Sequence, residues 1–437
     1  MIRVFLSLVI VVGLASPLRA AVEIREVTSP GGITAWLVEE HAVPFTALEI
    51  RFRGGGSLDR PGKRGAINLM GATIEEGAGE LDAQGFAAAR DELAAGFGFD
   101  ASRDAFSVSA RVLTENRNEA MALLRSALVE PRFDQSAINR VREQILSNLR
   151  GDLTDPNTIA GNLLNAMAYG DHPYATSMDG TIESVSALTR DDVLAAYGDV
   201  LVKDRVFVGA AGDITPEELG LLLDNLLGDL PTGGAPLPGP AELQLTGGIT
   251  VETLDIPQSV ALFGEAGIPR EDPDFFPAFV ANEIFGGSGQ QSRLSLEVRE
   301  ERGLTYGIGS YLVNFDYANV LLGQFASAND RVAEAVDVVR AEWRKMADEG
   351  VTPDELEAAQ TYLTGAYPLR FDSNASVARI LVGMQMDGLP IDYIKTRNGK
   401  IEAVTVEDLN RVAARLYRPD DLRFVIVGKP EGLESVN

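Results

Sequence analysis

The residues with the clearest potential for chemistry lie in the segment 286–311, GGSGQQSRLSLEVREERGLTYGIGSY. Arg299 offers a planar guanidinium with five donors, and Tyr306, seven positions later, offers a phenolic hydroxyl. Together they could hold a peptide carbonyl or a carboxylate. Taken alone, however, these residue types favour a structural interpretation, in which Arg299 pairs with a neighbouring glutamate and Tyr306 fills the core.

A helix, a turn and a strand are expected to position this pair. The sequence predicts a short helix over residues 293–302, with Arg299 near its end. Gly303 would end the helix, because a residue without Cβ readily adopts left-handed φ. Alternating apolar residues over 304–308 predict a strand with one buried face. The glycine-rich turn at 286–289 lacks the lysine of a phosphate loop, so we interpret it as a flexible turn beside a peptide groove.

The order of these motifs resembles the second domain of the pitrilysin/insulinase-type zinc peptidases, the inverzincins. In that family the Arg and Tyr reach across a cavity to substrate bound at the zinc of the first domain. The resemblance therefore implies that Arg299 and Tyr306, beside Gly286 and Gly287, bind substrate. The matching residues are Gly286-Gly287, Ser292-Arg293-Leu294, Arg299, Arg302-Gly303-Leu304 and Tyr306.

Active members of the same family carry H-x-x-E-H on a helix of the first domain, after a glycine-rich lead-in. The lead-in is present here as GGGSLDRPGKRG at 54–65. The positions of the two histidines are occupied by Asn68 and Ala72, and the position of the glutamate base by Gly71. The third zinc ligand, a more distant glutamate, is replaced by Asn148. The resemblance thus implies a zinc-less, non-catalytic subunit that binds no cofactor itself.

The residue inventory leads to the same conclusion without the family. A catalytic zinc needs three nitrogen, sulfur or carboxylate ligands, and histidines at i and i+4 place two of them on one helix face. The chain has two histidines, His41 and His172, and no cysteine. We interpret His172 as structural, His41 as a surface or turn residue, and Glu75 and Glu76 as helix-end charges. Thiol chemistry is excluded, and no G-x-S-x-G elbow is present.

The composition is that of an ordinary globular protein, with 45% hydrophobic and 23% charged residues. The net charge of −26 argues against a nucleic-acid partner, because phosphate binding needs a basic surface. An acidic cavity would favour basic peptides, but we prefer to explain the negative net charge by acidic residues spread over a solvated surface.

The first twenty residues, MIRVFLSLVIVVGLASPLRA, predict a secretory signal peptide. Their apolar run, 4–14, is too short to span a bilayer comfortably, and no later segment has some twenty apolar residues free of charge. We therefore expect a periplasmic protein without a permanent membrane anchor.

The mature chain is predicted to consist of two homologous domains, 21–230 and 249–437, joined by a proline- and glycine-rich linker at 231–248. Both blocks end with the same pattern of two helices and a strand, RVFVGAAGD in the first and RFVIVGKP in the second, which indicates duplication. Each half is predicted to be α+β, an antiparallel-rich sheet covered by helices. Helices are expected to begin after Asp82, Asp134 and Thr352. The resemblance implies that the halves form a clam shell.

We therefore interpret the chain as the non-catalytic subunit of a heterodimeric periplasmic zinc endopeptidase. It would supply Arg299 and Tyr306 to an active homologue that carries the zinc, and peptides would be the substrates. The alternative is a solitary peptide-binding or chaperone-like scaffold without hydrolytic activity. A third possibility is a structural core of a membrane complex, which the signal peptide makes less attractive.

Overall fold

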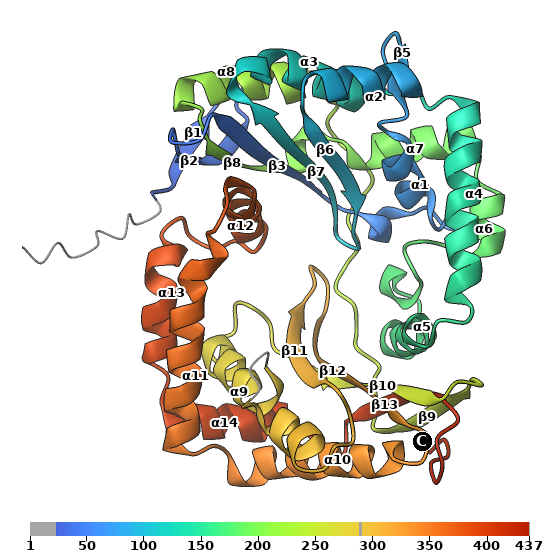
Figure 1. The fold of residues 1–437 in the computed structure, drawn as a ribbon, viewed down its shortest axis with the longest axis vertical. Coiled ribbons are helices and arrows are strands. Elements are labelled where there is room, and N and C mark those ends of the chain that lie inside the picture. Colours follow the sequence, from blue (N-terminus) through green and yellow to red (C-terminus); the bar gives the residue numbers. More distant parts are fainter. Residues whose placement is uncertain (1–22, 288–290, 437) are drawn as a thin grey trace, which may run out of the picture.

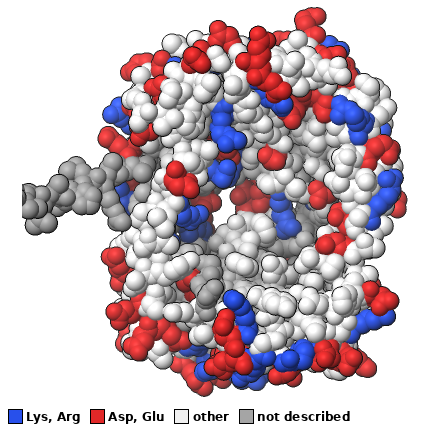
Figure 2. All heavy atoms as spheres, viewed as in Figure 1, with Lys and Arg blue, Asp and Glu red and all other residues white. Residues whose placement is uncertain are grey.

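The computed structural model describes residues 23–287 and 291–436, and these residues form an α+β fold (Figure 1). The predicted signal peptide lies outside the described residues, as do residues 288 and 289 of the glycine-rich turn. Two sheets face each other across the molecule, and Figure 2 shows a central hollow between them. The α+β prediction, with one antiparallel-rich sheet in each half, is confirmed.

The two sheets have equivalent strand orders, which is the structural signature of the duplication. The first has the order β1-β2-β8-β3-β7-β6 and the second β11-β12-β10-β13-β9. The second sheet, taken from β9 to β11, matches the first from β2 to β6, and β1 has no counterpart among the described strands of the second sheet. In each sheet a single pair is parallel, β2 with β8 and β13 with β9. The strands are β1 (Arg25–Thr28), β2 (Thr34–Glu39), β3 (Phe45–Arg53), β6 (Gly96–Ala101), β7 (Ala105–Leu113), β8 (Val206–Gly212), β9 (Gly248–Thr253), β10 (Gln258–Ala266), β11 (Ile308–Asn314), β12 (Asn319–Ala328) and β13 (Arg423–Gly428).

Helices cover the outer face of each sheet, except for one helix in each half. Those of the first half are α1 (Ala66–Thr73), α2 (Ala83–Glu92), α3 (Arg117–Val129), α4 (Gln135–Asp152), α5 (Pro156–Tyr169), α6 (Ile182–Ser186), α7 (Arg190–Val200) and α8 (Pro216–Leu227). Those of the second half are α9 (Phe275–Gly286), α10 (Val332–Glu349), α11 (Pro353–Ala366), α12 (Asn374–Met386), α13 (Tyr393–Glu402) and α14 (Val406–Leu416). The exceptions are α5 and α12, which pack on the sheet of the opposite half. A two-stranded ribbon, β4 (Gly77–Ala78) with β5 (Leu81–Asp82), precedes α2.

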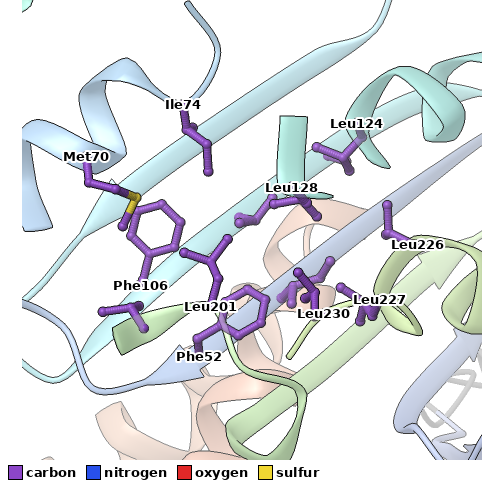
Figure 3. Packing of buried hydrophobic residues seen from close by; sticks show 14 of the residues in the cluster. Phe52, Met70, Ile74, Phe106, Leu124, Leu128, Leu201, Leu226, Leu227 and Leu230 are labelled. Atoms are coloured by element: carbon purple, nitrogen blue, oxygen red, sulfur yellow. The ribbon is translucent and has the colours of Figure 1, made fainter. Parts of the chain in front are cut away.

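Each half has its own hydrophobic core. In the first, alternate residues of the strands point toward α1, α3, α7 and α8, and Figure 3 shows Phe106 of β7 against Met70 of α1. In the second, Trp343 is fully buried, with its ring 5.0 Å from those of Phe285 and Tyr417. Full burial of one such side chain stabilises the fold by about 1.5–3 kcal/mol.

One helix of each half packs on the sheet of the other half, an arrangement that the sequence analysis did not predict. Helix α12 lies on β3 and β8 of the first sheet, where Leu381 is fully buried. Helix α5 lies on β10 and β13 of the second sheet, where Ala160 and Leu164 contact Val425. The two halves are thereby joined by apolar contacts as well as by the chain between β8 and β9.

The predicted helix starts are partly right. Asp82 accepts a hydrogen bond from the Gly85 amide at 2.9 Å, and Thr352 forms a capping box with Glu355. Asp134 precedes α4 as expected but does not cap it, because its carboxylate pairs with Arg132 at 2.8 Å instead. The segment 231–246 contains no helix or strand, and none of the helices in the described residues is long and apolar enough to cross a membrane.

Candidate functional site

Arg299 lies on a π-helix, Ser295–Glu300, within the predicted helical segment. Gly303 ends this segment in the left-handed region, with φ of 58°, as its lack of a Cβ predicts. The Gly303 amide donates to the Arg299 carbonyl at 3.0 Å, and the Leu304 amide donates to the Val298 carbonyl at 2.9 Å. The helical prediction is confirmed, but its π character was not foreseen. Such widened turns occur often at functional sites.

The strand after Gly303 begins later than predicted. Residues 303–307 form no strand, and β11 starts at Ile308. The Thr305 hydroxyl accepts from the Gly307 amide at 3.1 Å and donates to the Gly307 carbonyl at 2.9 Å, which fixes a turn in place of an extended chain. Tyr306 sits on that turn and is 93% exposed. The interpretation that Tyr306 fills the core is therefore wrong.

Arg299 lines a pocket of about 560 Å³. Gly287 lines it too, together with residues of β11 and β12, and Asn157 of α5 closes it from the first half. The Arg299 Nε atom lies 3.4 Å from a Glu300 carboxylate oxygen, but the two side chains are 37% and 50% exposed. Ion pairs this exposed are worth at most about 1 kcal/mol. Arg299 can therefore exchange Glu300 for a ligand.

The other two predicted substrate-binding residues differ from Arg299 in their surroundings. Gly286 is buried, and a Cβ there would come within 2.3 Å of the Ser310 Oγ atom, so its role in this structure is close packing of α9 on β11. Tyr306 does not line the pocket, although the adjacent Gly307 does. The structure thus brings Arg299 and Gly287 into one pocket and leaves Tyr306 beside it in solvent.

The four residues at the zinc-ligand and base positions lie on α1 and α4, which pack together. Asn68 donates to the Asp179 carboxylate at 3.0 Å, and Ala72 is exposed. Asn148 is exposed and accepts from Gln144 on the same helix at 3.1 Å. Amide and methyl groups of this kind do not fit a catalytic zinc.

Gly71, at the position of the base, is buried against a ring of the first sheet. A Cβ on Gly71 would lie 2.8 Å from the Phe106 Cε2 atom, so a glutamate could not be placed there without moving Phe106. Within 23–287 and 291–436, no three His, Cys, Asp or Glu side chains are grouped so that they could hold a metal ion.

The two histidines lie apart from these positions and serve local structure. His172 accepts the Tyr174 amide through Nδ1 at 3.2 Å, and burial lowers the pKa of its imidazole. His41 is exposed and contacts the Asp213 carboxylate at 2.7 Å, which raises the pKa of His41. His172 therefore has a structural role and His41 lies at the surface, as the sequence analysis expected.

The two glutamates after α1 are also paired with arginines. Glu75 lies 3.0 Å from Arg90, and Glu76 lies 2.5 Å from Arg140. Both act as charges near a helix end, in agreement with the sequence interpretation.

A polar junction between the halves was missed by the sequence analysis. The Asp104 carboxylate accepts the Tyr174 hydroxyl at 2.5 Å and the Asp316 amide at 3.2 Å. Asp316 in turn lies 3.1 Å from the Arg53 guanidinium. Burial raises the pKa of Asp316 to about 6. These residues come from a strand end, two turns between strands and a short 3-10 helix, so no local pattern in the sequence could have grouped them.

Comparisons with known proteins agree with this arrangement. The peptidase M16 inactive domain matches residues 187–363. A protein named non-peptidase homolog YmxG, from Helicobacter pylori, is 27% identical over 89% of this chain and 90% of its own length. A probable mitochondrial-processing peptidase subunit beta from Schizosaccharomyces pombe is 25% identical over 73% and 72%.

A crystal structure described as the peptidase M16 inactive domain from Pseudomonas fluorescens has a TM-score of 0.88 and 25% identity, and covers 95% of this chain and all of that one. A chain of complex III2 from Candida albicans shares the fold, with a TM-score of 0.76 at 17% identity over 95% and 97% of the two chains. The motif around Arg299, the duplicated fold and these matches agree. The chain is similar to the pitrilysin-type peptidases of family M16 and to their inactive domain, and the residues at that family's zinc-ligand positions are replaced in it.

Proposed function

We propose that the chain is the non-catalytic subunit of a heterodimeric zinc endopeptidase of the periplasm. Its partner would be a homologue that carries H-x-x-E-H and the zinc. One observation carries the proposal: Arg299 stays accessible in a pocket of about 560 Å³, while Asn68, Ala72 and Asn148 cannot bind zinc. The substrate-holding half of the family's site is retained, and the metal-holding half is lost.

In this proposal Arg299 binds a backbone carbonyl of the peptide or stabilises the negative charge that develops at the scissile bond. Among the described residues, Arg299 forms an ion pair only with Glu300, and this exposed pair is weak enough for a peptide to replace it. Tyr306 would donate its hydroxyl to the same oxygen across the subunit interface. Its exposure of 93% leaves it accessible to a second chain, and exposed tyrosines of this kind are common at interfaces.

The edge of the second sheet supports peptide binding. Strand β11 pairs only with β12 in the described residues, and Ile308, Gly309 and Tyr311 of β11 line the Arg299 pocket. An unpaired edge presents backbone amides and carbonyls that an extended peptide can bind as an added strand. A peptide on this edge would pass directly in front of Arg299.

The heterodimer and its location rest on two further arguments. The mitochondrial-processing peptidase relative is named as a subunit, and the complex III2 neighbour is part of an assembly, so relatives of this fold work in complexes. The predicted signal peptide at 1–20 argues for export. Fractionation of cells that express the full chain should recover it in the periplasm with its first twenty or so residues removed.

The proposal is tested by mixing. The chain, an H-x-x-E-H homologue exported by the same cell, and an equimolar mixture of both are assayed for cleavage of a quenched fluorescent unfolded peptide in the presence of zinc. We expect cleavage only by the mixture, together with a heterodimer in sedimentation velocity. A homologue that is equally active alone, with no complex formed, would contradict the proposal.

The alternative function is a solitary peptide-binding or chaperone-like scaffold. The free edge of β11 favours it as much as it favours the heterodimer, because strand addition needs no second subunit. The same experiment separates the two: peptide bound by this chain alone, with no gain in cleavage on mixing, would select the scaffold.

A further inference from the structure

We propose that a second pocket, where α12 meets the first sheet, binds the carboxylates of acidic peptides. The pocket has a volume of about 320 Å³ and is lined by five arginines and one aspartate: Arg51, Arg270, Arg370, Arg379, Arg397 and Asp387. We call it the arginine pocket. Arg51 comes from β3 of the first half, and the other five come from the second half.

The charge of this pocket is opposite to that of the chain. Acidic residues outnumber Lys and Arg by 64 to 38 in the whole sequence, yet arginines outnumber carboxylates by five to one among these lining residues. A solvated acidic surface does not produce such a local excess. Figure 2 shows basic side chains on the walls of the central hollow, with acidic side chains among them. A concave basic site attracts anions and concentrates them.

Arg397 is the strongest sign that an anion belongs there. Its side chain is 6% exposed, and its guanidinium donates to the Leu363 carbonyl at 3.2 Å and lies 4.2 Å from the centre of the Tyr367 ring. No carboxylate of the described residues lies within 4.0 Å of it. Burial, with Arg370 and Arg270 nearby, lowers the pKa of Arg397. A buried charge without an opposite partner is costly, and a bound carboxylate would relieve that cost.

Three of the other arginines are equally available. Arg270 donates to the Tyr393 hydroxyl at 2.6 Å and stacks on Phe275 at 4.2 Å, so its partners are aromatic. Arg370 and Arg379 are exposed, and neither forms an ion pair with another described residue. Only Arg51 is engaged, with Glu49 at 3.3 Å. Asp387 attracts Arg270 and Arg51, and Glu49 attracts Arg379, but these two carboxylates do not match the five guanidinium groups. A ligand would therefore meet an excess of positively charged donors.

The remaining walls define what kind of anion fits. Phe276, Phe279, Tyr367 and Tyr393 contribute aromatic surface, and Leu389 adds an aliphatic side chain. A small inorganic anion would leave this surface unused, whereas a peptide with acidic and apolar side chains would use both parts. The volume is at the lower end of the range for organic ligands, which suits one or two side chains and not a whole peptide.

The inference rests on the proposed function in one respect, namely that peptides enter the hollow between the halves. It adds a preference: peptides with acidic side chains or a free C-terminal carboxylate next to an apolar residue would be retained. An acidic cavity would have favoured basic peptides, whereas this pocket is lined mainly by arginines and should favour acidic ones.

The test is isothermal titration calorimetry on the mature chain alone, without any zinc subunit. The probe is an N-acetylated hexapeptide of alternating phenylalanine and glutamate with a free C-terminus. It is compared with its amidated form and with the peptide that has glutamine for glutamate. Arg370→Gln and Arg379→Gln are chosen because both side chains are exposed, so we expect their loss to leave the fold intact. Arg344→Gln, exposed on α10 and outside the pocket, removes the same charge as a control.

We expect binding of the acidic peptide that weakens about tenfold in each pocket variant, in line with one lost charge-assisted hydrogen bond, and not in Arg344→Gln. Loss of affinity on amidation would assign the pocket to the C-terminal carboxylate, and loss with glutamine would assign it to the side chains; either supports the inference. Equal binding of all three peptides, or equal affinity in Arg344→Gln and the pocket variants, would overturn it. The calorimetry measures binding by this chain alone and no cleavage. Absence of binding would therefore not contradict the heterodimer, and an inactive mixture would not contradict peptide binding in the arginine pocket.

Discussion

Substituting Gly209 by alanine tests how the two halves are joined. Gly209 is buried on β8, directly beneath α12. A Cβ there would lie 2.3 Å from the Ala378 carbonyl oxygen and 3.0 Å from the Val382 Cγ2 atom. Ordinary contacts of a Cβ start near 3.4 Å, so α12 must move by about 1 Å or the strand must bend. Overpacking of this kind destabilises proteins by about 1–3 kcal/mol.

The assay is urea unfolding of the mature chain together with hydrogen exchange of the α12 amides. Gly209→Ala should lose about 2 kcal/mol, and if the strain is relieved by local opening, exchange in 374–386 should be up to about thirtyfold faster. The control is Gly198→Ala in α7, where a Cβ meets nothing within 4 Å and should stabilise the helix by about 0.5–1 kcal/mol. The reasoning is refuted if both variants have the same stability.

Two further predictions concern a helix cap and the polar junction. Asp82→Ala should lower the free energy of unfolding by about 1 kcal/mol because it removes the hydrogen bond to the Gly85 amide, whereas Asp134→Ala should have a smaller effect because Asp134 caps nothing; urea unfolding measures both, and equal losses would contradict the assignment. Burial raises the pKa of Asp316 to about 6 in the folded state, above its ordinary 3.8, so the folded state binds this proton more tightly. Protonation of Asp316 should therefore raise the free energy of unfolding as the pH falls through 6, by about 1 kcal/mol between pH 7 and pH 5. Asp316→Asn should lack that part of the pH dependence, and an unchanged difference between unfolding free energies at the two pH values would contradict the role of Asp316.

The sequence predicted well what depends on neighbours along the chain. Gly303 ends its helix in the left-handed region, and Thr352 forms a capping box, because both effects need only a few consecutive residues. The strand after Gly303 was predicted too early, since alternation over 304–308 is a weak pattern and the Thr305 side chain fixed a turn instead. The π form of the Arg299 helix has no pattern that distinguishes it from an α-helix.

The contacts between distant segments could not be predicted from one sequence. Packing of α12 on the first sheet depends on Gly209 allowing a close approach, and a lone glycine in a strand has several explanations. The arginine pocket combines residues from 51 to 397 that share no motif. In the same way, Arg299 and Asn157 meet in one pocket only because α5 crosses to the second sheet.

The central claim is that this chain completes a zinc peptidase in trans through Arg299. The most direct measurement is kcat of the mixed subunits with wild-type chain, Arg299→Ala and Arg344→Ala, at equal complex concentration verified by sedimentation. The account predicts a loss of about 100- to 1000-fold for Arg299→Ala, typical of removing one preorganised donor, and no change for Arg344→Ala. Tyr306→Phe should lower kcat in the same direction. Full activity of the mixture with Arg299→Ala would contradict the account.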